Sequence, residues 1–135
     1  MKRRQILKLL KALPAGILIA CQNNFPSTPT VATGKIVDEN EMPLEGVSIH
    51  LYGFKVKGFS PIPTFEERTK TDKDGTYRLS YVVPRGTHEV RVFPEVNLLI
   101  KQGINGRYEK VTAPTRVPSE DYGKKLIYNF QIIKN

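Results

Sequence analysis

The chain has 135 residues and one cysteine, which argues for a single domain and excludes both an intramolecular disulfide and a cysteine-rich metal site. Its first 20 residues hold five of the 21 Lys and Arg and none of the 13 acids, so most of the formal net charge of +8 belongs to them. The remaining residues carry 16 basic and 13 acidic side chains, and the basic composition therefore gives no argument for nucleic-acid binding.

Residues 1–20 have the pattern of an export signal that is removed from the mature protein. A basic start is followed by an apolar stretch at residues 12–20, which is shorter than the roughly 20 residues that a membrane-spanning helix needs. Arg3 and Arg4, followed by a spacer, two apolar residues and Lys8, resemble a twin-arginine export motif. A general secretory signal with adjacent arginines is the alternative.

Residues 18–21, Leu-Ile-Ala-Cys, resemble the lipobox of bacterial lipoproteins. In proteins with this motif the cysteine thiol is diacylated and the signal is cut just before it, so the resemblance implies a lipid-modified Cys21. Two or three acyl chains hold a small protein on a membrane, whereas one chain binds only marginally. The alternative is an ordinary buried cysteine. Gln22 lacks the carboxylate of an inner-membrane retention signal, which favours the outer membrane.

Residues 22–30 are rich in Asn, Ser, Thr and Pro, and with Cys21 they are predicted to form a flexible tether at residues 21–30. The remaining residues, 31–135, show the patterns of strands and turns and no helical periodicity. Alternation is clearest at residues 46–52, where Val47, Ile49 and Leu51 share one face. Further strands are expected at residues 33–38, 66–71, 77–83, 88–93, 108–112 and 125–133.

Three long connections are predicted between these strands, at residues 53–65, 97–107 and 113–124. Connections of this length in a compact domain are often functional. The first is the candidate partner-binding loop, because exposed aromatic rings and positive charges can dock a partner. Its candidate residues are Phe54, Lys55, Lys57, Phe59 and Phe65. The alternative is that these rings cover an open end of the core.

Three segments, taken together, resemble the carboxypeptidase regulatory-like domain, which has a transthyretin-like fold. They are residues 33–38 with 43–49 (TGKIVD and PLEGVSI), residues 71–77 (TDKDGTY) and residues 83–92 (VPRGTHEVRV). The resemblance implies that residues 31–135 form an all-β, seven-stranded antiparallel Greek-key β-sandwich of the prealbumin-like type. In known relatives this domain is a non-catalytic module, so we expect no catalytic residue and no cofactor.

Metal sites are not expected either. Asp72, Asp74 and Gly75 resemble the start of a calcium loop, but the twelfth position is a valine, and a hairpin turn explains them better. The two histidines, His50 and His88, lack the paired spacing of a zinc site.

Two related architectures carry chemistry of their own. Intradiol ring-cleaving dioxygenases share a similar frame and hold iron with two Tyr and two His, but only His88 follows Pro84 in this chain. Pilin domains form Lys–Asn isopeptide bonds beside a buried acid. Lys35 on the first expected strand and Asn129 on the last could form such a pair, but the acid-bearing sequence is not evident. A metal-dependent enzyme related to the dioxygenases is the alternative function, although its iron-ligand pattern is incomplete in this chain.

The sequence thus predicts an exported, lipid-anchored, non-catalytic binding or structural module of the cell envelope, at the periplasmic face of the outer membrane or at the cell surface. We expect its lipid to contact the membrane and its loops to contact a protein or glycan, with no nucleic-acid partner. An accessory subunit of an envelope transporter or hydrolase is a further alternative.

Overall fold

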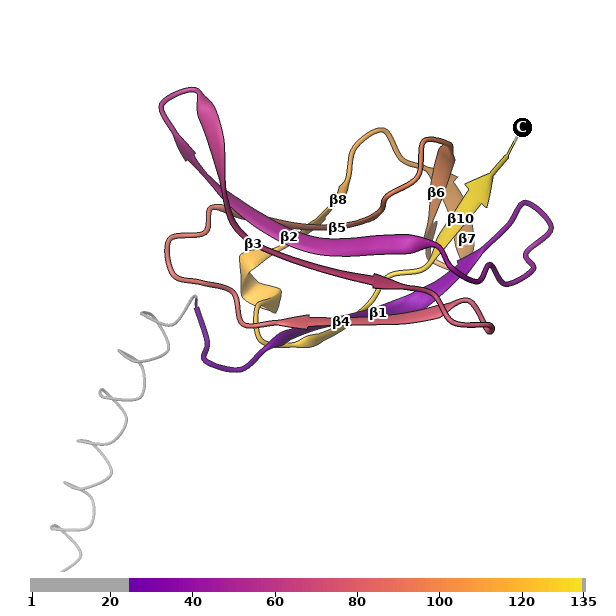
Figure 1. The fold of residues 1–135 in the computed structure, drawn as a ribbon, viewed down its shortest axis with the longest axis horizontal. Coiled ribbons are helices and arrows are strands. Elements are labelled where there is room, and N and C mark those ends of the chain that lie inside the picture. The colour runs from indigo at the N-terminus through magenta and orange to yellow at the C-terminus, as the bar shows by residue number, and fades with distance from the viewer. Residues whose placement is uncertain (1–24, 135) are drawn as a thin grey trace, which may run out of the picture.

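The computed structural model describes residues 25–134, which form two β-sheets packed against each other (Figure 1). The all-β sandwich expected from the sequence is confirmed. Arg3, Arg4 and Cys21, with the leader predicted at residues 1–20, lie outside the described residues. Within residues 25–134, no helix combines the length and the apolar character needed to cross a membrane.

The first sheet has the strand order β4-β1-β10-β6-β7, with β9 also paired to β1. Its strands are β1 (Thr30–Val37), β4 (Thr76–Tyr81), β6 (Leu99–Ile104), β7 (Arg107–Lys110), β9 (Lys125–Ile127) and β10 (Phe130–Ile133). The second sheet has the order β3-β2-β5-β8. Its strands are β2 (Ser48–Lys57), β3 (Ser60–Lys70), β5 (Glu89–Pro94) and β8 (Thr115–Val117). One short 3-10 helix, η1 (Ser119–Asp121), precedes β9.

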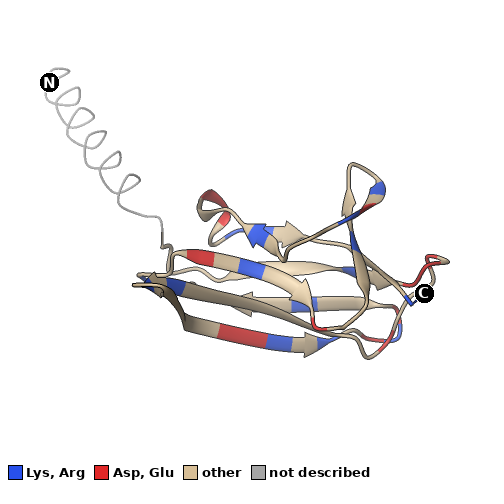
Figure 2. Ribbon diagram, turned by 90° about the horizontal axis from the view of Figure 1, so that it is seen from above, with Lys and Arg blue, Asp and Glu red and all other residues tan. Residues whose placement is uncertain are grey.

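The core lies between the two sheets, and the alternating strands of the sequence supply it. Ile49 and Leu51 on β2 and Val90 and Val92 on β5 are fully buried, as the period-2 pattern predicts. The first sheet faces them with the buried side chains of Ala32, Ile36, Tyr77, Leu79, Ile100, Phe130 and Ile132. Charged residues of both signs are spread along the strands and turns rather than gathered on one element (Figure 2).

Ten strands are present among the described residues instead of the seven expected, and the pairing is not wholly antiparallel. β1 runs parallel to both β9 and β10. Residues 125–133, predicted as one strand, break at Tyr128 and Asn129. At this break the main chain lies so close to Gly34 that a Cβ there would be only 1.9 Å from the Tyr128 carbonyl oxygen. The Asn129 side chain accepts the main-chain N–H of Lys35 at 2.9 Å across this break.

The predicted connection at residues 97–107 is wrong, because it contains β6 and the turn into β7. Asn105 and Gly106 have φ of 53° and 80°, and two successive positive values are typical of a type I′ hairpin turn. Part of the third predicted connection, residues 113–124, is also regular, since it holds β8 and η1.

The turn predicted at Asp72 is present, but it joins β3 of one sheet to β4 of the other and so closes no hairpin. Asp72 Oδ1 accepts the main-chain N–H of Asp74 at 2.9 Å and of Thr76 at 3.0 Å, and the Thr76 hydroxyl donates to Oδ2 at 2.6 Å. These bonds favour the charged carboxylate and lower the pKa of Asp72. Gly75 has φ of 76°, as a turn glycine should.

Residues 25–30, placed in the tether by the sequence, contact the domain. Thr30 opens β1 and is fully buried, with its hydroxyl accepting the N–H of Gly123 at 2.8 Å. The Phe25 ring lies 6.0 Å from the Tyr122 ring. Phe25 and Thr30 therefore pack against the sandwich.

Candidate functional site

The candidate loop at residues 53–65 is the outer half of a long β-hairpin formed by β2 and β3, so its prediction as a loop is wrong. Only Gly58 and Phe59 connect the two strands, and Gly58 has φ of 67°. A two-residue turn with a positive φ at its first position has the geometry of a type II′ turn. Pro61 and Pro63 are tolerated because β3 is an edge strand, where a missing N–H leaves no ladder incomplete.

A β-bulge bends this hairpin. Gly53 pairs with Phe65 and Phe54 pairs with Pro63, so Thr64 is an extra residue on β3. Bulges increase the local twist of a hairpin. The tip of the hairpin accordingly curves away from the sandwich (Figure 1).

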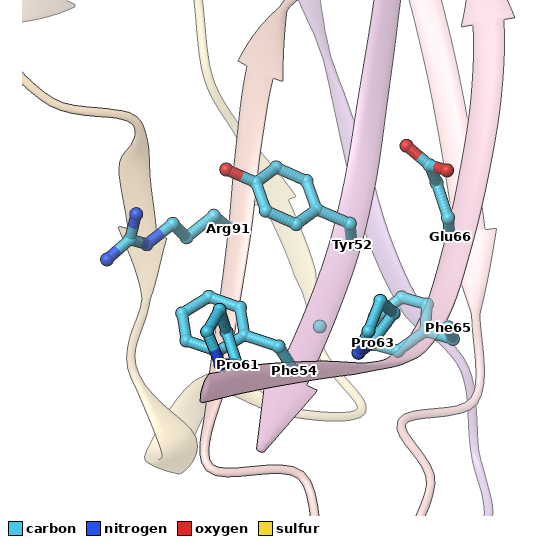
Figure 3. Close-up of a pocket in the computed structure, with 8 residues that line it drawn as sticks. Tyr52, Phe54, Pro61, Pro63, Phe65, Glu66 and Arg91 are labelled. Atoms are coloured by element: carbon cyan, nitrogen blue, oxygen red, sulfur yellow. The ribbon is translucent and has the colours of Figure 1, made fainter. Parts of the chain in front are cut away.

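A groove of about 390 Å³ lies at the bend, which is within the usual range of ligand pockets, roughly 300–1,000 Å³. The rings of Tyr52, Phe54, Pro61 and Pro63 line it, with Glu66 on the β3 side and Arg91 on the β5 side (Figure 3). Gly53 and Phe65 complete the lining. The surface offered to a ligand is therefore mostly apolar and formed by side-chain rings. One negatively and one positively charged group lie at its margins.

Both marginal charges are already paired. Arg91 Nε donates to Glu89 Oε2 at 2.6 Å, and the Arg91 guanidinium lies 5.2 Å from the centroid of the Phe54 ring. Glu66 Oε2 lies 2.8 Å from His50 Nδ1 and 2.9 Å from the Arg68 guanidinium. A ligand can thus cover the rings without having to compensate an isolated charge.

The structure divides the five candidate loop residues between two places. Phe54 lines the groove, and Phe65 reaches it from the core side, where its buried ring stacks on Tyr81 at 4.7 Å. Lys55, Lys57 and Phe59 are exposed on the hairpin tip. The interpretation that these rings cover the core holds for Phe65, whereas Phe59 covers nothing.

Six of the eight groove residues were not among the candidates from the sequence: Tyr52, Gly53, Pro61, Pro63, Glu66 and Arg91. The alternation at residues 46–52 places Tyr52 on the outer face, and Pro61 and Pro63 follow the turn residue Gly58. These two patterns could have identified the three residues from the sequence. Arg91 comes from β5, and it reaches the groove only because it pairs with Tyr52 across the sheet.

A polar cluster on the outer face of the second sheet was also missed. Candidate metal-ligating atoms of His50, Glu66 and Glu95 lie within 4.8 Å of one another. No other group of three such side chains is this close together in the part of the chain that the structure describes. Arg68 occupies the cluster, since its Nε donates to Glu95 at 2.9 and 3.1 Å. A metal would have to displace this guanidinium, so the cluster is an ion-pair network.

The iron-ligand set of the dioxygenase alternative is not assembled within residues 25–134. His50 is held by Glu66, whereas His88 Nδ1 accepts the main-chain N–H of Val56 at 2.9 Å. The buried Tyr77 hydroxyl donates to the Tyr128 carbonyl at 2.6 Å, and burial raises its pKa strongly. Lys35, the isopeptide candidate, is exposed.

No family model and no curated protein matches the chain. Among solved structures, 3-chlorocatechol 1,2-dioxygenase from Rhodococcus opacus 1CP is 10% identical with a TM-score of 0.46, over 84% of this chain and 62% of that one. BcpA, the major pilin subunit of Bacillus cereus, is 13% identical with a TM-score of 0.45, over 80% and 31%. The shaft pilin SpaA from Lactobacillus rhamnosus GG is 10% identical with a TM-score of 0.38, over 79% and 49%. The chain spans less than two thirds of each of these proteins, and the likeness carries no argument about activity.

Proposed function

We propose that the chain is an exported lipoprotein whose carboxypeptidase regulatory-like sandwich acts as a non-catalytic binding module at the cell envelope. The support for the anchor is the order of three features: a basic start, a short apolar stretch, and the lipobox-like residues 18–21. Two or three acyl chains on Cys21 would hold the domain at a membrane. Only three residues separate Cys21 from Phe25, the first described residue.

The groove at the bent hairpin is the binding site in this proposal. The observation that carries it is a concave surface of two aromatic and two proline rings whose marginal charges are already ion-paired. Covering such rings is favourable because apolar surface leaves water while the ion pairs stay intact. Grooves lined by aromatic rings recognise extended, apolar protein segments.

This lining favours a protein partner over a glycan. A glycan presents many hydroxyl groups, each of which needs a hydrogen-bonding partner when it leaves water. The rings of Tyr52, Phe54, Pro61 and Pro63 offer mainly apolar surface, and Glu66 and Arg91 are engaged elsewhere. We therefore assign the groove to an extended protein segment with an apolar side chain.

Site-specific photo-crosslinking in cells tests this assignment. A benzoylphenylalanine in place of Phe54 should give a discrete adduct that protease removes, because the probe stands in the groove. The matched control is the same probe at Ile127, which is 73% exposed on β9 of the other sheet. The assignment is wrong if both positions give the same adducts, if neither gives one, or if the adduct resists protease and yields to glycosidases.

A further inference from the structure

The tip of the β2–β3 hairpin exposes apolar side chains in a segment without acids. Phe59 is fully exposed and Val56 is 49% exposed. Lys55 and Lys57 are exposed beside them, and residues 53–65 contain no Asp or Glu. Two lysines and a bare aromatic ring form a pattern that suits the boundary between lipid headgroups and acyl chains.

The tip lies at the end of the sandwich where the described chain begins (Figure 1). Thr30, the first residue of β1, pairs with Tyr81 at the end of β4. The Tyr81 ring in turn stacks on Phe65 in the hairpin. These contacts tie the start of β1 to the base of the hairpin tip.

The proposed anchor brings a lipid surface to this same end. Phe25 is four positions after Cys21, and an extended chain spans at most about 14 Å over four positions. Acyl chains on Cys21 would therefore hold this end of the domain close to the bilayer. Phosphate groups of anionic lipids would meet the positive charges of Lys55 and Lys57 there.

We propose that the hairpin tip, residues 55–60, is a second membrane contact that works together with the lipid anchor. Phe59 enters the headgroup region and the two lysines lie against anionic lipid. This inference rests on the proposed acylation of Cys21. The acyl chains supply the affinity, and the tip restricts the tilt of the domain, because a body held at two points cannot swing as freely as a body held at one.

A fluorescent depth measurement on the lipidated protein tests the inference. Once Cys21 is acylated, a Phe59→Cys substitution offers a single reactive thiol for an environment-sensitive nitrobenzoxadiazole label. The matched control is Lys73→Cys, an exposed position in the turn beyond the other end of β3. Both proteins are placed in vesicles of phosphatidylethanolamine and phosphatidylglycerol, with or without lipids that carry a quenching doxyl group.

The label at position 59 should emit at shorter wavelength and be quenched several-fold more strongly than the label at position 73. Replacing Lys55 and Lys57 by Glu should reduce that quenching, and so should the omission of phosphatidylglycerol. Equal quenching at the two positions on acylated, vesicle-bound protein would overturn the membrane contact while leaving the anchor intact, and would leave the tip free for a protein partner. An unacylated Cys21, seen by mass spectrometry of the same sample, would instead overturn the anchor and this inference with it.

Discussion

Arg68 organises the outer face of the second sheet through its contacts with two carboxylates. Its guanidinium binds Glu95 and Glu66, and His50 lies 2.8 Å from Glu66. The hydrogen bond from Arg68 is the largest cause of the lowered pKa of Glu95, and the hydroxyl of Ser48 adds to it. His50 lies on β2, Glu66 and Arg68 lie on β3, and Glu95 directly follows β5. The network therefore joins these three neighbouring strands.

A Glu95→Gln substitution should alter how stability depends on pH. The pKa of Glu95 is lower in the folded chain than in the unfolded chain, where a glutamate side chain has a pKa of about 4.3. The contribution of Glu95 to the free energy of unfolding is therefore complete above the pKa of the unfolded chain. It is lost as the pH falls through the lower pKa of the folded chain. We expect the variant to be less stable than the parent at pH 7, and the difference in stability to be smaller at pH 3, in urea unfolding.

The matched control for that comparison is Glu45→Gln, because Glu45 is an exposed acid that makes no ion pair among the described residues. It should change stability little at either pH. A loss for Glu95→Gln of the same size at pH 7 and pH 3 would mean that packing, and not the charge of Glu95, is responsible.

At the scale of elements, the junction of β1 with β9 and β10 depends on Gly34. The Tyr128 N–H donates to the Thr33 carbonyl at 2.8 Å, and the Tyr77 hydroxyl donates to the Tyr128 carbonyl at 2.6 Å. This brings the Tyr128 main chain against Gly34, where only a residue without a Cβ fits. Two parallel pairings with the first strand of the domain are formed on either side of this contact.

Gly34→Ala should destabilise the domain by about 1–3 kcal/mol or more, because the new Cβ would overlap a main-chain oxygen rather than a movable side chain. The change should appear as a lower midpoint in chemical unfolding. The matched control is Gly103→Ala in the same sheet, whose Cβ would lie 3.3 Å from the Asn129 Cβ and should be tolerated better. Equal losses for the two variants would show that the close approach at Gly34 is not what constrains the junction.

The sequence predicts those elements whose cause is local. The alternation at residues 46–52 and the Asp72 turn both depend on neighbours in the chain, and both are present. The turn at Asn105 and Gly106 also has a local cause, because an Asn-Gly dipeptide favours a two-residue hairpin turn. A hairpin could therefore have been predicted there instead of a long connection. The break at Tyr128 could not be predicted, because it lies where the chain packs against Thr33 and Gly34, which are remote in sequence.

The candidate site shows the same division. Phe54 was singled out as one of three aromatic residues in a segment with two lysines. Residues 54–57 were assigned to a loop, although apolar and charged residues alternate there as in a strand. The two prolines further obscured β3. The groove itself requires the bulge at Thr64 and the pairing of Tyr52 with Arg91. Both are properties of strand register, which depends on packing across the whole sheet.

In the whole molecule, three parts lie at one end of the sandwich: the first described residues, the groove and the hairpin tip (Figures 1 and 3). The second sheet supplies the groove from β2, β3 and β5, and the first sheet holds the N-terminal segment through Thr30 and Gly123. An anchor at Cys21 would therefore set the groove near the membrane, where it could reach a partner held in the same layer.

Mass spectrometry of the N-terminal peptide of the mature protein, taken from the membrane fraction of expressing cells, tests whether Cys21 carries the proposed lipid anchor. We expect residues 1–20 to be absent and Cys21 to carry a diacylglyceryl group on its sulfur. We also expect Cys21→Ser to abolish both the modification and the cleavage before residue 21. A peptide that keeps the leader, or one that begins elsewhere with a free thiol at Cys21, would contradict the proposed anchor.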